Sequence, residues 1–157
     1  MEKFYTVEDI AKMTMFTTRT IRNYLKDGLL TGRKIGGQWR FTSSDIEKFM
    51  NQGQIGDMIR SEKKQNVLDF LDGIFSEYTG EVQTCTITDV YRPKEAVQEL
   101  ADKLVALPSA MASPNAPALN RMSYEYDNSE GRARFILFGT PEYIGEAMKI
   151  VSHYKGD

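Results

Sequence analysis

The stretch TTRTIRNYLKDGLL, residues 17–30, decides how the first third of the chain folds. Thr17 can cap the start of a helix, and Gly28 tolerates the left-handed conformation in which helices often end. Between them, Ile21 and Tyr24 recur at helical spacing and form an apolar face. The sequence therefore predicts an amphipathic helix between these two caps.

A second short helix is predicted immediately before this one. Thr6 and Asp9 have the spacing of a capping box, with Asp in place of the more usual Glu. Val7 and Ile10 then recur at helical spacing, and the helix is expected to end near residues 13–14. Two short helices joined by a tight turn describe a helix-turn-helix.

Residues 33–41, RKIGGQWRF, predict a hairpin after the second helix. Gly36 and Gly37 permit the positive φ angles that a two-residue hairpin turn requires. A third helix is expected to follow, with Ser44 and Glu47 as its capping box. A basic hairpin beside a helix-turn-helix is the arrangement of a winged helix.

The chain here resembles the excisionase-like and MerR-like winged helix-turn-helix superfamily. The resemblance rests on YTVEDIA at residues 5–11, TIRNYLKDGLL at 20–30 and GGQWRF at 36–41, and it covers about a third of the chain. Two features depart from MerR regulators. Asn23 stands where a second aromatic residue is usual, and the long dimerising coiled coil is missing.

The resemblance implies contacts to double-stranded DNA from the helix and from the wing. It assigns them to Arg19, Arg22, Asn23 and Tyr24 in the helix and to Lys34, Gln38 and Arg40 in the wing. The exposed side of the predicted helix adds Thr17, Thr18 and Lys26, and the wing tip adds Gly36 and Gly37. Trp39 is expected to pack on the protein and not to stack on bases.

The charge distribution supports a nucleic-acid partner for the first part of the chain only. Residues 1–64 hold 12 Lys and Arg against 8 Asp and Glu, whereas residues 65–157 hold 8 against 14, and the formal net charge is −2. This asymmetry is typical of a basic DNA-binding unit joined to an acidic regulatory or assembly unit.

The remaining sequence predicts a linker at residues 52–64 and a second domain at 65–157, after a first domain at 1–51. In the second domain we expect an α-β-α-β-β-α order, giving a two-layer α+β sandwich. It suggests a ferredoxin-like split arrangement with one strand missing, and no family is recognised in it. The expected helices are 66–78, 93–107 and 141–154, the expected strands are 82–90, 122–126 and 132–138, and a loop is expected at 107–117.

Strand alternation predicts which face of this sheet the helices cover. We expect Cys85 and Ile87 to lie on the covered face with Tyr124 and Phe135. The opposite face would carry a mixture of polar and apolar side chains, namely Thr84, Thr86, Thr88, Ser123, Glu125, Arg134, Ile136 and Phe138. That mixture, and the sheet's free edges, predict a homodimer formed through this face or through an edge.

These features predict a sequence-specific transcriptional regulator whose second domain dimerises, senses a small-molecule effector, or does both. The alternatives are an excisionase-type architectural recombination factor and a docking protein for a DNA-processing complex. We expect no enzyme, no cofactor and no metal site, because the only histidine is His153 and the only cysteine is Cys85. The polar start and the absence of a long apolar run predict a cytoplasmic protein with no membrane partner.

Overall fold

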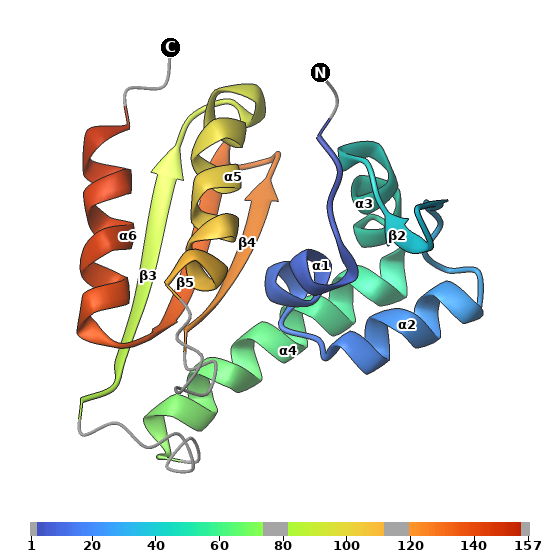
Figure 1. Ribbon diagram of the computed structural model, residues 1–157. Coiled ribbons are helices and arrows are strands. Elements are labelled where there is room, and N and C mark those ends of the chain that lie inside the picture. Colours follow the sequence, from blue (N-terminus) through green and yellow to red (C-terminus); the bar gives the residue numbers. More distant parts are fainter. Residues whose placement is uncertain (1–2, 74–81, 112–119, 155–157) are drawn as a thin grey trace. The chain divides into compact units, whose positions relative to one another are not determined.

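The computed structural model describes residues 3–73, 82–111 and 120–154, and the chain divides into two units, Met1–Leu68 and Asp69–Asp157. The first unit is helical with one hairpin, and the second contains a sheet with helices (Figure 1). This is the α+β architecture, with an N-terminal helix-turn-helix, that the sequence predicts.

The first unit consists of α1 (Val7–Thr14), α2 (Thr18–Lys26), the strands β1 (Arg33–Ile35) and β2 (Gln38–Arg40), α3 (Ser43–Met50) and most of α4 (Gly53–Leu71). Its core contains Ile10, Ile21 and Phe41, each 0% exposed. Tyr5 and Phe41 form an antiparallel bridge, in which the N–H of Tyr5 donates to the Phe41 carbonyl at 2.7 Å. The bridge fixes the base of the hairpin on this core.

Two helix starts were predicted from capping boxes, and one of them was misplaced. The Thr6–Asp9 box at the start of α1 is confirmed. The box of α3 is formed by Thr42 and Asp45, not by Ser44 and Glu47 as predicted. The bridge to Phe41 explains the earlier start, because Thr42 directly follows a residue whose backbone is held in extended form.

The segment expected to be a linker is helical, since α4 covers residues 53–71. Its glycines misled the prediction. Ile55 is 4% exposed, and a Cβ on Gly56 would lie 3.1 Å from the carbonyl oxygen of Met50. The side-chain amide of Gln52 also donates to the Leu29 carbonyl at 2.7 Å. Tertiary packing outweighs the low helix propensity of glycine here. The predicted helix over 66–78 is described only to Leu71, and residues 74–78 lie outside the described ranges.

The second unit contains β3 (Thr84–Tyr91), α5 (Lys94–Ala110), β4 (Arg121–Asp127), β5 (Arg132–Gly139) and α6 (Pro141–His153). The sheet order is β3-β5-β4, and β5 is antiparallel to both neighbours. This is the split arrangement lacking one strand that the sequence suggests. Residues 107–110, expected in a loop, form the last turn of α5 with Pro108 inside it, and residues 112–117 lie outside the described ranges.

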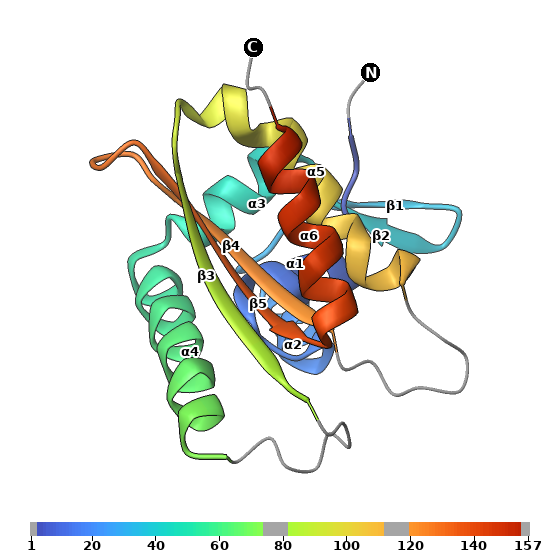
Figure 2. The ribbon, with the colours of Figure 1, turned by 90° about the vertical axis from the view of Figure 1, so that its left-hand side faces the viewer.

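Helices α5 and α6 lie on the same side of this sheet (Figure 2). Phe135 and Leu137 of β5 are 0% exposed on the covered side, and so are Leu100 and Leu104 of α5, which contacts β4 and β5. The hydroxyl of Thr88 lies 3.8 Å from the sulfur of Met148 in α6.

The side chains of β3 therefore have the opposite orientation to the predicted one. Thr88 pairs with Phe135, so the threonines of β3 share the covered face with Phe135. Cys85 and Ile87 lie on the other, open face, and Ile87 is 51% exposed. Phe70, from the last turn of α4, packs against Phe138 on this open face, with the two ring centroids 5.7 Å apart. The expectation that all three helices cover one face is therefore wrong for α4.

Candidate nucleic-acid interface

Helix α2 presents a row of polar and basic side chains, because its apolar side is fixed on the core. The side chain of Thr17 accepts a hydrogen bond from the N–H of Thr20 at 3.1 Å, which starts the helix as predicted. Gly28, at φ +78, follows its end in the left-handed conformation. With Ile21 buried, the exposed side chains are those of Arg19, Arg22, Asn23 and Lys26.

Tyr24 differs from these residues, although the resemblance assigned it a DNA contact. Its ring centroid lies 5.8 Å from that of Phe16 and 5.4 Å from that of Phe49, and its hydroxyl lies 3.7 Å from the sulfur of Met58. Desolvation by these neighbours raises the pKa of Tyr24. Tyr24 therefore anchors α2 on α3 and α4. Thr18 is likewise half-buried.

The hairpin has the two-residue turn that its glycines predict. Gly36 and Gly37 have φ angles of +60° and +82°. Lys34 pairs with Trp39 on one face of the ribbon, and the Lys34 ammonium lies 5.5 Å from the Trp39 ring centroid. The other face carries Gln38 and the paired residues Arg33 and Arg40.

Arg33 is an exposed cation that was not among the predicted contacts. Its place opposite Arg40 follows from the two-residue turn, so strand alternation would have identified it. The guanidinium of Arg40 donates to the Gln38 side-chain oxygen at 2.7 Å and to the Trp39 carbonyl at 2.8 Å. These bonds hold Arg40 along the ribbon.

A cleft of about 320 Å³ joins the start of α1, helix α2 and the hairpin. It brings Arg22 together with three predicted contact residues of the hairpin, and its lining consists of Thr6, Val7, Glu8, Arg22, Gly37, Gln38, Trp39 and Arg40. Arg19, Asn23, Lys26 and Lys34 are not part of the lining.

Arg22 is held in this cleft by an exposed ion pair. Its guanidinium lies 3.5 Å from the Glu8 carboxylate, and the two side chains are 58% and 59% exposed. An exposed pair of this kind contributes little energy. A phosphate could therefore take the place of Glu8 at little cost. Sequence reasoning missed this pair because no local pattern links residues 14 positions apart.

Groups that could support other functions are few in the parts of the chain that the structure describes. His153 is exposed at the end of α6, with Nδ1 2.7 Å from the Lys149 carbonyl oxygen. Burial raises the pKa of the Cys85 thiol, and the charge of Arg121 opposes that rise. Within the described ranges no His, Cys, Asp and Glu cluster could hold a metal ion, and no described helix has the length and apolarity needed to cross a membrane.

Comparison with known proteins identifies the first unit. A family model described as a helix-turn-helix domain matches residues 4–54. No curated protein and no solved structure matches the chain. The N-terminal part of the chain is therefore a DNA-binding helix-turn-helix domain.

Proposed function

We propose that the chain is a sequence-specific transcriptional regulator of the winged, excisionase-like and MerR-like type. Helix α2 enters the major groove of double-stranded DNA, and the β1–β2 hairpin acts as a wing on the backbone or the minor groove. The observation that carries this proposal is the row of exposed Arg19, Arg22, Asn23 and Lys26 on a helix fixed by its buried side, next to a basic hairpin.

The chemistry of these side chains suits two different tasks. An exposed Arg can donate two hydrogen bonds to guanine, and an exposed Asn can pair with adenine, so Arg19 and Asn23 are assigned to base reading. Lys34 and Arg40 are assigned to phosphates, which position the protein without reading sequence. No side chain at Gly36 or Gly37 obstructs the approach of the hairpin tip to the DNA.

The second unit is proposed to join two copies of the chain, to respond to a small-molecule effector, or to do both. A single helix-turn-helix makes few base contacts, so two copies on adjacent half-sites are needed for useful specificity. No catalytic role is assigned to this unit.

The test is selection of binding sites from a randomised duplex library with the full-length chain. Two half-sites whose centres are about 10 base pairs or a multiple apart are expected. The matched control is Lys103→Ala with Lys149→Ala, which removes two exposed lysines of the second unit and should select the same sites. A library without enrichment would overturn the proposal.

Mapping of bound sites in the genome separates regulation from the architectural alternative. Enrichment at promoters is expected for a regulator. Enrichment confined to attachment sites of mobile elements, together with DNA bending in a gel-shift assay with phased sites, would instead identify an excisionase-type factor.

A further inference from the structure

Strand β3 forms an edge of the sheet in the second unit. In the order β3-β5-β4, one side of β3 is paired with β5 over all eight residues from Thr84 to Tyr91 (Figure 1). Within the described ranges no strand pairs with its other side. The backbone groups on that side form a ready template for another strand.

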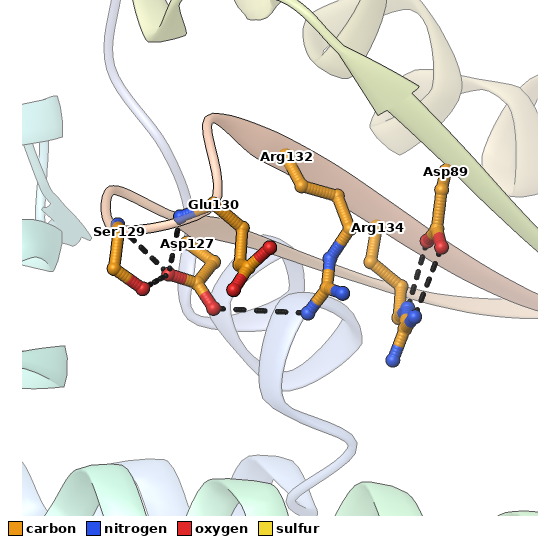
Figure 3. Close-up of polar contacts among 6 residues, drawn as sticks. All are labelled: Asp89, Asp127, Ser129, Glu130, Arg132 and Arg134. Carbon is orange, nitrogen blue, oxygen red and sulfur yellow. Dashed lines mark hydrogen bonds and ion pairs between the residues drawn. The ribbon is translucent and has the colours of Figure 1, made fainter.

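This edge lacks the features that usually prevent strands from pairing. β3 contains no lysine and no proline, and its register with β5 is continuous, without a bulge. Its only charged residue is Asp89. Figure 3 shows that the Asp89 carboxylate faces Arg134 of β5, with two hydrogen bonds of 2.7 and 2.9 Å. The charge of Asp89 is thus neutralised within the sheet and does not prevent another strand from pairing with this edge.

We propose that β3 pairs antiparallel with β3 of a second copy, so that the two three-stranded sheets become one six-stranded sheet. This proposal rests on the proposed function in one respect: a DNA-binding regulator needs two helix-turn-helix domains on one DNA duplex. We take the partner to be a second copy of this chain, because β3 is complementary to itself, as its possible registers show.

Symmetry restricts these registers. Residues directly opposite each other in an antiparallel pair point to the same face of the sheet, so a two-fold axis must lie midway between one residue and its own copy. Centring on Ile87 places the 51% exposed Ile87 side chain against Ile87 of the second copy. In the same register Asp89 faces Cys85, and Thr86 faces Thr88.

The neighbouring register, centred on Thr88, is less favourable. It places Ile87 opposite Asp89 of the second copy, so a larger apolar side chain faces the carboxylate than the Cys85 that faces it in the Ile87 register. Its apolar pair on the open face is Cys85 with Tyr91. Centring on Asp89 would place two like charges directly opposite each other. The register centred on Thr86 avoids both but pairs only residues 84–88 of β3. The Ile87 register also avoids both, pairs residues 84–90 and adds about eight backbone hydrogen bonds.

Oxidative cross-linking of the full-length chain tests the register. In a Cys85→Ser background, Ile87→Cys should give a disulfide-linked dimer, because directly opposite Cα atoms lie about 4.5–5.5 Å apart, within disulfide range. Tyr91→Cys in the same background is the matched control. Its side chain is also exposed, on the same face, but its copy would lie about 26 Å away. It should remain uncross-linked.

Sedimentation and DNA binding complete the test. The unmodified chain should be a dimer at about 10 µM, and Ile87→Arg, which places two cations opposite each other, should shift it to monomer. A monomeric unmodified chain, or a dimer that cross-links equally through Tyr91→Cys, would overturn the proposal. Binding of Ile87→Arg to a single half-site should be unchanged, so failure of the dimer and failure of DNA reading are distinguished.

Discussion

Arg134 and Asp89 form a two-pronged ion pair between β5 and β3, in which Nε donates to Oδ1 at 2.7 Å and Nη2 donates to Oδ2 at 2.9 Å. These hydrogen bonds hold the pKa of Asp89 below its usual range. A carboxyl with a lowered pKa contributes stability that is present above its unfolded pKa and is lost as the pH falls through its folded pKa.

We therefore expect Asp89→Asn to lower the free energy of unfolding by about 0.2–1 kcal/mol at neutral pH, the range for ion pairs near the protein surface, and by less in strong acid. Urea unfolding of the full chain at both pH values measures this difference. Glu146→Gln, which breaks an exposed pair within α6, is the control and should show a smaller pH dependence. An equal loss at both pH values would contradict the assignment.

Gly32 is required where the chain passes from α2 to the hairpin. A Cβ at this position would lie 2.6 Å from two ring carbons of Phe41 and 2.7 Å from the Arg40 carbonyl oxygen. Because Phe41 is 0% exposed, its ring has little room to move. We expect Gly32→Ala to destabilise the chain by about 1–3 kcal/mol in denaturant unfolding.

The control is Gly53→Ala, since nothing lies within 4 Å of a Cβ at Gly53. It should leave stability unchanged or raise it slightly, because alanine favours helix. Equal effects of the two substitutions would show that contact with Phe41 does not determine the result.

The helix-turn-helix could be predicted from sequence because its signals are local. Thr6 with Asp9, Thr17, and Gly28 each act within one helical turn, and all three act as predicted. The course of α4 could not be predicted in this way. The burial of Ile55 and the hydrogen bond from Gln52 to the Leu29 carbonyl, 23 residues away, accompany it, and both follow only from the tertiary fold.

The orientation of β3 shows where the alternation of apolar and polar residues fails to predict the buried face of a strand. Cys85 and Ile87 are more apolar than the threonines between them, so the prediction placed them inward. The same alternation would then bury Asp89, whose charge is costly to desolvate. In the structure Asp89 remains on the open face with Arg134, and Thr88 contacts Met148 under the helices. The cost of burying the Asp89 charge thus outweighs the gain from burying Ile87 in place of threonine.

Base reading and phosphate contact should be separable by mutation. Arg19→Ala and Asn23→Ala should each reduce discrimination between bases by about 1–3 kcal/mol, as measured by competition with single-base variants of the selected site. Each side chain is exposed on α2, so the fold should not change. Unchanged discrimination in both variants would mean that another face of α2 meets the DNA.

Lys34→Ala should weaken binding to all sequences evenly. If Lys34 neutralises one phosphate, its loss should reduce the slope of log K against log salt by about 0.9. Fluorescence anisotropy across a salt series provides the measurement. Lys149→Ala, which removes an exposed lysine of the second unit, should leave the slope unchanged. A parallel loss of slope in both variants would point to a non-specific charge effect.

Trp39 offers a direct report on the hairpin, because it is the only tryptophan in the chain. Its ring is 36% exposed and lies nearly parallel to Phe41, with the centroids 6.4 Å apart. DNA bound against the hairpin would cover the exposed part of the ring. Duplex DNA should therefore change the Trp39 emission and reduce its quenching by iodide, with the same midpoint as the anisotropy change.

Two further measurements would show that this emission change comes from DNA bound against the hairpin. Raising the salt concentration should reverse it, because release of the phosphate backbone re-exposes the ring. Trp39→Phe should bind DNA with nearly unchanged affinity, since a phenyl ring can keep the packing on Phe41. A base stacked on Trp39 would instead be worth about 1–3 kcal/mol. Unchanged emission at saturating DNA would place the hairpin away from the duplex and leave α2 as the sole contact.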